Sequence, residues 1–515
     1  MAAQLTAKKC SIQSRVVIRV TLHGVHWDVR PDLAPHLEAV LASEGSGIKE
    51  SPVKLVTRHE AAGRTWFIKR YRHCRVPARP LKYYFKPSQA RQEWDLALRL
   101  ERLGIPIVRH AALGERWGFG LRESILVTEG FDGQPLDETP DADMQAVMAF
   151  VQTLHDRGVL QRDLHPGNIL RHAATGELRL VDLHGTVIRP TLRPEEREAN
   201  LATLRISLPI PVAPAILELS RRMRRKCLVR RARRCLRHNR DFEPRRIGPL
   251  RWQVRRVWMN AATEAILGDP DGFLASRAEI LKAGRSSTVG RADERVLKRF
   301  NLRKPLNVLK DLFRWSKARR AFFKAYHLEI AGVPTARPIA VADRRVAGFL
   351  WRSYFLMEEI ADARHLGLWV GDARQAVTAV AEVIARLHEE GFTHRDLKET
   401  NLVFDVTGKL HLIDLEGLEF LEVVPRERAL RDLARLEDGA RALPGFTPAL
   451  RRQFVRRYTQ ARGLRPRAFF RPVAQSAGAI TPALPGSAPM RANRGVRVPT
   501  RRGSGGGPAP PRPDR

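Results

Sequence analysis

The chain holds 515 residues, too many for one hydrophobic core, so two or three domains are expected. A hydrophobic share of 43% excludes a fibrous protein and one that is disordered throughout. The 91 Lys and Arg residues against 55 Asp and Glu give a net charge of +36, which favours anionic partners without choosing among nucleic acid, membrane surfaces and phosphorylated glycolipids.

The cysteines and the apolar runs indicate the compartment. None of the cysteines forms a CxxC pair, and no histidine cluster accompanies them: Cys10, Cys74, Cys227 and Cys235. A disulfide framework or zinc site is therefore not expected, and a reducing compartment fits. The sequence offers neither a signal-peptide pattern nor an apolar run of about 18 residues that could span a bilayer. We expect a cytoplasmic protein, and any contact with the inner face of the membrane should be peripheral.

In chain order, the first candidate elements are a β-like run and a helix. The run WFIKRY (66–71) carries Lys69 late in the strand, and the predicted helix in ARQEWDLALRLERLGIP (90–106) carries Glu93. Phosphoryl transfer requires positioning and charge neutralisation more than covalent chemistry. A lysine could bind the phosphates, and a carboxylate on the next helix could hold that lysine in place.

A second predicted helix leads into a polar loop. Its apolar residues recur at helical spacing, and Gly158 follows in a position suited to a left-handed helix end: Val147, Phe150, Val151 and Leu154. The loop and the hairpin after it read LHDRGVLQRDLHPGNIL (154–170) and TGELRLVDLHG (175–185). Asp163 would orient the attacking hydroxyl, while Asn168 and Asp182 would supply hard oxygen ligands to a metal ion.

The same order of elements recurs in the second half. LHEEGFTHRDLKETNLV (387–403) repeats the loop 233 positions later, and its neighbours repeat too: RVLKRF (295–300), ARRAFFKAYHLEIAGVP (318–334) and TGKLHLIDLEG (407–417). The counterparts of the site residues are Lys298, Asp396, Asn401 and Asp414. Val380, Val383, Ile384 and Leu387 form the corresponding helix face, before Gly391. The repeated D-x4-N loop with a later VDL or IDL indicates a kinase-like architecture.

The two copies differ at two informative positions. Ala321 stands where the first copy has Glu93, so the second copy lacks the expected partner for its lysine or takes one from elsewhere. Gln161 stands where the second copy has His394, which favours a structural role for that histidine. Glycine-containing candidates for a phosphate loop are of low specificity: GSGIKESPVKL (45–55) and KAGRSSTVG (282–290).

The domain boundaries follow from these blocks and from composition. We predict kinase-like domains at 15–220 and 266–473, a basic helical linker at 221–265, and a disordered tail rich in Pro, Gly, Ser, Ala and Arg at 474–515. The stretch 221–256 holds 16 Lys and Arg against Asp241 and Glu243, a net charge of +14. It could hold an anionic acceptor or a membrane surface, or it could form ordinary solvated faces.

At these residues the chain resembles the lipopolysaccharide core kinase family, which includes Kdo and heptose kinases. The resemblance rests on IKRY…RQEW…GIP…RDLHPGN…VDL in the first half and LKRF…GVPTARPIA…HRDLKETN…IDLEG in the second. It implies an α+β fold of two tandem, two-lobed, protein-kinase-like domains that use ATP with Mg²⁺ or Mn²⁺ to phosphorylate a sugar hydroxyl of the inner core. It also implies nucleotide contacts from Lys69, Glu93 and Lys298 and from two hinge residues, Glu129 and Glu358.

The departures from that pattern narrow the function. Asp182-Leu183-His184 and Asp414-Leu415-Glu416 replace DFG, and no APE-like segment follows either aspartate. This favours a small-substrate kinase over a regulated eukaryotic-type protein kinase. Although each copy departs from the full set of site residues at one position, we expect activity in both halves. The alternatives are a bacterial Ser/Thr protein kinase or another small-molecule kinase, and a pseudokinase pair that acts as a scaffold. No zinc-finger, RNA-recognition or helix-turn-helix pattern supports a nucleic-acid partner.

Overall fold

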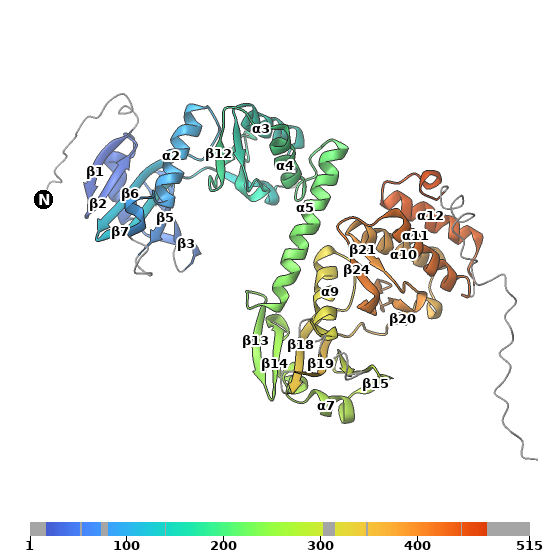
Figure 1. Ribbon diagram of the computed structural model, residues 1–515. Helices are drawn as coiled ribbons and strands as arrows, with labels where there is room; N and C mark the ends of the chain where they lie inside the picture. The colour runs from blue at the N-terminus through green and yellow to red at the C-terminus, as the bar shows by residue number, and fades with distance from the viewer. Residues whose placement is uncertain are drawn as a thin grey trace, which may run out of the picture. The chain divides into compact units, whose positions relative to one another are not determined.

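The computed structural model describes residues 17–51, 54–73, 81–139, 141–301, 315–346, 349–443 and 445–470. The chain divides into two compact units, Met1–Arg234 and Cys235–Arg515 (Figure 1). Each unit contains a large antiparallel sheet followed by a mostly helical lobe. The predicted α+β fold with two tandem two-lobed domains is therefore confirmed, while the predicted tail at 474–515 lies outside the described residues.

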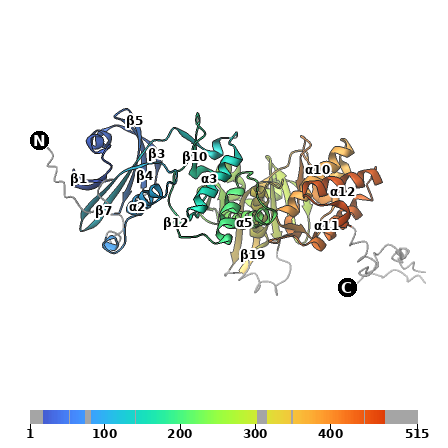
Figure 2. The same cartoon turned by 90° about the horizontal axis from the view of Figure 1, so that it is seen from above.

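The first unit begins with a seven-stranded antiparallel sheet in the order β1-β2-β6-β7-β5-β4-β3. Its strands are β1 (Ile18–Leu22), β2 (Val25–Val29), β3 (Gly45–Glu50), β4 (Lys54–Ala61), β5 (Arg64–Arg72), β6 (His110–Gly118) and β7 (Gly120–Glu129). The lobe also contains α1 (Leu37–Ala42) and α2 (Gln89–Arg102). Because side chains alternate along β5, Trp66 and Ile68 enter the core shared with α1. Lys69 and Tyr71 face the other side of the sheet, against which α2 packs (Figure 2).

The second lobe of the first unit surrounds the polar loop. Its helices are α3 (Met144–Asp156), α4 (Pro194–Arg205) and α5 (Pro214–Arg233), and its short strands are β8 (Gly133–Pro135), β9 (Val159–Gln161), β10 (Ile169–His172), β11 (Leu178–Leu180) and β12 (Thr186–Ile188). The predicted apolar face of α3 is buried in one core. Gly158 is left-handed, with φ +71°, and a Cβ there would lie 1.8 Å from the Arg189 carbonyl oxygen, so only glycine fits.

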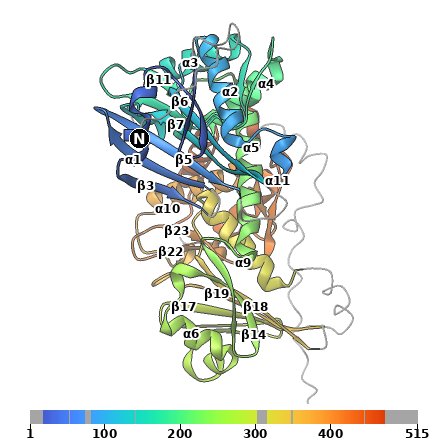
Figure 3. The ribbon, with the colours of Figure 1, turned by 90° about the vertical axis from the view of Figure 1, so that its left-hand side faces the viewer.

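The second unit repeats this sheet, in the order β13-β14-β18-β19-β17-β16-β15 (Figure 3). Its strands are β13 (Phe242–Ile247), β14 (Leu250–Arg255), β15 (Glu279–Ala283), β16 (Ser287–Ala292), β17 (Arg295–Asn301), β18 (Pro338–Val346) and β19 (Phe349–Glu358). The lobe also contains α6 (Ala261–Gly268), α7 (Pro270–Gly272) and α9 (Lys317–Ala331). Each strand of the first sheet thus has a counterpart in the second, including the pair β1-β2, which matches β13-β14.

The structure differs from the predicted basic helical linker at 221–265. Helix α5 ends at Arg233 within the first unit, and β13 and β14 belong to the second sheet, so that unit begins well before residue 266. The physical reason is that Trp252 and Val254 alternate toward the core while arginines occupy exposed positions between apolar residues. The high arginine content obscured this two-residue period.

The second lobe of the second unit follows the pattern of the first. It contains α10 (Ala373–Glu389), α11 (Arg426–Ala440) and α12 (Pro448–Ala461), with β20 (Arg364–His365), β21 (Phe392–His394), β22 (Leu402–Phe404), β23 (Leu410–Leu412) and β24 (Leu418–Phe420). The predicted hairpins before each aspartate are confirmed, as β10 pairs with β11 and β22 with β23. Within the described ranges, no helix combines the length and apolarity needed to cross a membrane.

Candidate active sites

The first unit brings Lys69 and Glu93 together between β5 and α2. Lys69 Nζ lies 2.6 Å from Glu93 Oε1, and the two side chains are 13% and 8% exposed. Burial alone would raise the pKa of Glu93, but the Lys69 ammonium and His110 outweigh it and lower that pKa to about 2. Glu93 is therefore a carboxylate at neutral pH, and it fixes the Lys69 ammonium group between β5 and α2.

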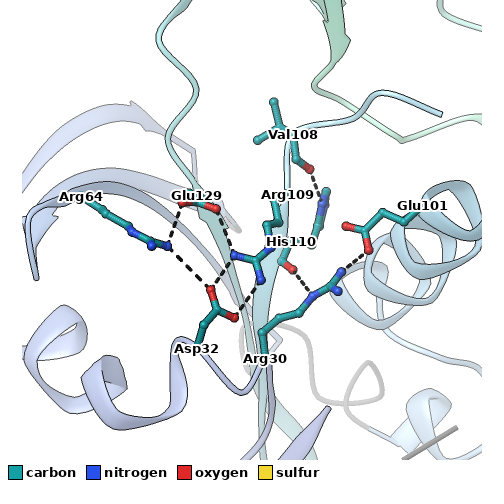
Figure 4. Close-up of polar contacts among 8 residues, drawn as sticks. All are labelled: Arg30, Asp32, Arg64, Glu101, Val108, Arg109, His110 and Glu129. Atoms are coloured by element: carbon teal, nitrogen blue, oxygen red, sulfur yellow. Dashed lines mark hydrogen bonds and ion pairs between the residues drawn. The ribbon is translucent and has the colours of Figure 1, made fainter. Parts of the chain in front are cut away.

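The neighbour of Glu93 links this ion pair to the rest of the sheet lobe. His110 Nε2 lies 3.4 Å from Glu93 Oε1, and its Nδ1 lies 2.9 Å from the Val108 carbonyl oxygen. Arg30 donates to the His110 carbonyl oxygen at 3.0 Å and also pairs with Glu101 on α2 (Figure 4). These contacts hold α2 and the start of β6 in a fixed relation, so Glu93 has little freedom to leave Lys69.

The predicted hinge residue Glu129 belongs to an arginine network. Arg109 binds Asp32 with both terminal nitrogens, at 2.6 and 2.8 Å, and also donates to Glu129 at 3.3 Å (Figure 4). Arg64 approaches Glu129 from the other side at 3.1 Å. Because these arginines bind the Glu129 carboxylate, a nucleotide contact at this position would rest on the backbone. In the second unit, Glu358 has a similar partner, Arg337, at 3.5 Å.

The loop of the first unit is organised by hydrogen bonds to its own backbone. Asn168 Nδ2 donates to the Asp163 carbonyl oxygen at 3.0 Å, which leaves the amide oxygen of Asn168 as the group suited to a cation. Gln161 Nε2 donates to the Asp182 carbonyl oxygen at 2.6 Å, and the Val181 N–H donates to the Asn168 carbonyl oxygen at 3.0 Å. The three predicted acid and amide residues are thus held on one connected loop and hairpin.

The second unit builds the same arrangement. Asn401 Nδ2 donates to the Asp396 carbonyl oxygen at 2.8 Å, and His394 Nε2 donates to the Asp414 carbonyl oxygen at 3.0 Å. Burial lowers the pKa of His394, so its imidazole is neutral near pH 7. His394 and Gln161 therefore make the same contact, which supports the structural role predicted for the histidine. Lys398 Nζ adds a cation 2.7 Å from Asp396 Oδ1, where the first unit has His165.

A cavity in the first unit joins residues of both lobes. It has a volume of about 260 Å³, and Tyr71, Glu93, Asp182 and His184 are among its lining residues. Burial, together with the charges of Glu93 and Asp182, raises the pKa of Tyr71. The carboxylate that holds the lysine and the predicted metal ligand therefore reach the same space from opposite sides.

The oxygen ligands available in each unit suit a hard divalent cation. Each unit offers one amide and one carboxylate, Asn168 with Asp182 and Asn401 with Asp414, on the segments just described. Among the described residues, no three His, Cys, Asp or Glu side chains gather as a metal site made by protein alone. Mg²⁺ commonly takes one or two carboxylates and completes its shell with substrate phosphates and water, so the residues present fit it.

Two residues that the sequence did not single out anchor these loops. Asn200 on α4 donates to the Gln161 carbonyl oxygen at 2.6 Å and lies 2.9 Å from His155 Nε2. Asp432 on α11 accepts from the His394 N–H at 2.8 Å and lies 3.3 Å from His388 Nε2. The available signal was the histidine of the repeated LH pair, because a buried imidazole requires a polar partner.

The lysine of the second unit takes its carboxylate from another element. Lys298 Nζ lies 3.1 Å from Glu416 Oε1 and 3.6 Å from Asp414 Oδ1. Ala321, which stands on α9 at the position of Glu93, is buried, with 8% of its surface exposed. Of the two alternatives left open for this copy, the structure supports the second, in which the lysine takes its carboxylate partner from elsewhere. Of the glycine-containing segments, 45–55 includes strand β3 and the start of β4, with residues 52 and 53 outside the described part of the chain, and 282–290 belongs to the edge hairpin β15-β16.

Comparison with known proteins adds family and structural relatives. The family described as "Lipopolysaccharide kinase (Kdo/WaaP) family" matches residues 38–220 and 283–458. Two enzymes named 3-deoxy-D-manno-octulosonic acid kinase, from Xanthomonas axonopodis pv. citri and Xanthomonas euvesicatoria pv. vesicatoria, are each 34% identical over 107 residues. That stretch covers 20% of this chain and 43% of each relative's length.

Two solved structures show more distant likeness. WaaP in complex with acyl carrier protein matches with 25% identity and a TM-score of 0.28, over 37% of this chain and 82% of that one. A crystal structure of WbdD matches with 15% identity and a TM-score of 0.26, over 39% of this chain and 50% of that one.

Proposed function

The chain belongs to the lipopolysaccharide kinase (Kdo/WaaP) family, and from this premise we propose that it transfers the γ-phosphoryl group of ATP to a sugar hydroxyl of the lipopolysaccharide inner core. The observation that carries the proposal is the position of Glu93 in the first unit, where it holds Lys69 at 2.6 Å and lines a cavity together with Asp182. Such an arrangement serves charge neutralisation and positioning, which are the main needs of phosphoryl transfer.

Each residue has a defined part in this reaction. Lys69 and Lys298 bind phosphate oxygens, while Asp163 and Asp396 orient the acceptor hydroxyl and receive its proton. Asn168 with Asp182, and Asn401 with Asp414, would hold Mg²⁺ or Mn²⁺, which when bound neutralises charge on the transferred phosphate. Gln161 and His394 keep each metal-binding aspartate in register with its loop, because they hold the aspartate's backbone carbonyl.

The preferred acceptor is a Kdo hydroxyl rather than a heptose hydroxyl, because the matched Xanthomonas relatives are named as kinases of that sugar. An acceptor of this class is an anionic glycolipid. Exposed arginines at the end of α5 would favour the anionic inner leaflet where such a glycolipid is found: Arg230, Arg231 and Arg233. Retention on vesicles containing anionic lipid at low salt, and release at high salt, is the expected behaviour.

The test of the proposed function is transfer of label from [γ-³²P]ATP to Kdo-bearing and heptose-bearing acceptors by the full chain. We expect label in the Kdo-bearing acceptor, and a loss of at least about 100-fold when Asp163→Ala and Asp396→Ala are combined, because both orienting carboxylates are then gone. Asp141→Ala and Asp438→Ala are matched controls, since both remove exposed aspartates.

Three results would contradict the proposed function. Turnover retained by the double variant would refute the catalytic assignment. Label found on a protein but on neither sugar would favour a protein kinase. Absence of transfer by the unmodified chain, with cellular function intact in the double variant, would favour a scaffold.

A further inference from the structure

We propose that Glu416 is the positioning residue for Lys298 in the second unit, where it does from the aspartate loop what Glu93 does from helix α2 in the first. The inference rests on the proposed function, because it assumes that Lys298 binds a nucleotide. It assigns a role to the third residue of Asp414-Leu415-Glu416, where other kinases have glycine.

The two lysines occupy equivalent places in their sheets. Lys69 on β5 lies opposite Leu126 on β7, and Lys298 on β17 lies opposite Phe355 on β19. Their side chains are 13% and 17% exposed, so each ammonium group is largely withdrawn from solvent. A cation in such a place requires a carboxylate partner, because desolvation of an unpaired charge is costly.

The helix of the second unit cannot supply that partner. Ala321 replaces the glutamate, and the one acidic residue of α9 is Glu329. Glu329 is already bound by Arg255 through two contacts of 2.9 Å, as Glu101 is bound by Arg30 in the first unit. The carboxylate for Lys298 must therefore come from outside the helix.

The aspartate loop supplies it. Glu416 Oε1 lies 3.1 Å from Lys298 Nζ, whereas the equivalent residue of the first unit is His184.

Helix α9 carries lysines at two positions where α2 has uncharged residues. Lys324 on α9 donates to the carbonyl oxygens of Leu415 and Glu416, at 3.0 and 3.1 Å, and Lys317 Nζ lies 3.9 Å from Glu416. The positions of these lysines in the first helix are occupied by uncharged residues, Leu96 and Gln89. In the first unit, the acid therefore lies on the helix. In the second unit, the acid lies on the loop and the helix carries the cations.

As a result, the positions of Lys298 and Lys69 depend on different elements. In the second unit, Lys298 is held by the same short segment that carries the proposed metal ligand Asp414. Phosphate-binding and metal-binding groups are therefore coupled through one loop. In the first unit, the lysine is instead coupled to the placement of α2.

The test measures nucleotide binding to the second unit in the full chain. Lys69→Ala and Asp182→Ala together remove the first site, and the probe is an ATP bearing a fluorescent group on its ribose, added with Mg²⁺. Onto this background are added Glu416→Gln, the pair Glu416→Gln with Ala321→Glu, and the control Glu427→Gln, which removes an exposed acid on α11. Circular dichroism and thermal melting check that each variant folds.

We expect Glu416→Gln to raise the Kd by about tenfold, because Lys298 loses its charged partner. Adding Ala321→Glu should return the Kd to within about threefold of the background by restoring the arrangement of the first unit. Unchanged or tighter binding by Glu416→Gln would overturn the proposal, as would failure of Ala321→Glu to restore binding, or no binding by the background variant. If the chain binds the nucleotide as expected but phosphorylates no sugar, only the proposed function fails. Failure of the proposed function and failure of the role of Glu416 are therefore distinguishable.

Discussion

The two units share a sheet order and a loop geometry but hold Lys69 and Lys298 by carboxylates from different elements. In the first, Glu93 on α2 meets Lys69; in the second, Glu416 after Asp414 meets Lys298. The comparison indicates that a carboxylate is required beside the lysine, and that either the helix or the aspartate loop can supply it. A duplicated domain can therefore lack the helix glutamate and still keep an ion pair to its lysine.

The side chains that anchor the two loops through hydrogen bonds also differ in type between the units. Gln161 and His394 both donate to the backbone carbonyl of the following aspartate, although one is an amide and the other an imidazole. Asn200 and Asp432 likewise anchor equivalent loops, although only one is charged. The first exchange preserves the donor, whereas the second reverses the hydrogen bond: Asn200 donates to the Gln161 carbonyl oxygen, and Asp432 accepts from the His394 N–H.

The largest effect that would test this comparison is expected from Glu93→Ala. Measured in an Asp396→Ala background, kcat/KM should fall about 100-fold, because removing one partner of a largely buried ion pair costs about 3 kcal/mol. Glu195→Ala, at an exposed position in α4, is the control. A loss below about threefold would mean that Lys69 is positioned without its carboxylate, and the parallel with Lys298 would fail.

The loop anchors should give a smaller effect that separates the units. Asp432→Ala should lower the free energy of unfolding by about 2 kcal/mol, because it leaves the His394 N–H and His388 without their acceptor, while Asn200→Ala should cost about 1 kcal/mol. Urea unfolding of the full chain, followed separately for each transition, measures both values. An equal or larger cost for Asn200→Ala would contradict the view that charge makes Asp432 the stronger anchor.

The smallest effect is expected where the two units exchange an amide for an imidazole. His394→Gln should change kcat of the second unit by less than about threefold, since the new amide can donate to Asp414 as Gln161 does to Asp182. Its pH–rate profile should be unchanged, because burial lowers the pKa of His394 and keeps it from titrating near neutrality. His394→Ala is the comparison, with an expected loss of about tenfold. An altered pH profile for His394→Gln would assign the histidine a proton-carrying role.

Local patterns predicted the elements that carry the loops. The apolar face of α3, the hairpin β10-β11 and the left-handed Gly158 each depend on residues close in sequence, and each is confirmed. The ion pair between Lys69 and Glu93 was also foreseeable, because the strand and the helix that carry them lie close together in the sequence. The role of each residue in binding or catalysis stays a prediction.

Contacts between distant segments were not predictable in this way. Lys298 and Glu416 lie far apart in the chain, and the letters DLE do not say which cation the glutamate meets. Strand β14 was hidden because arginines lie among its inward-facing apolar residues, such as Trp252. Asn200 and Asp432 are single polar residues on otherwise ordinary helices, and their importance depends on the loops that fold over them.

The most direct test of the account is the number of nucleotide sites per chain. Calorimetric titration of the full chain with a non-hydrolysable ATP analogue and Mg²⁺ should give two sites, one per unit. Asp182→Ala and Asp414→Ala should each remove one, and their combination should remove both. Binding that survives the combined variant, or the absence of any site in the unmodified chain, would contradict the claim that each unit builds its own cleft around a lysine, a carboxylate and a metal-binding aspartate.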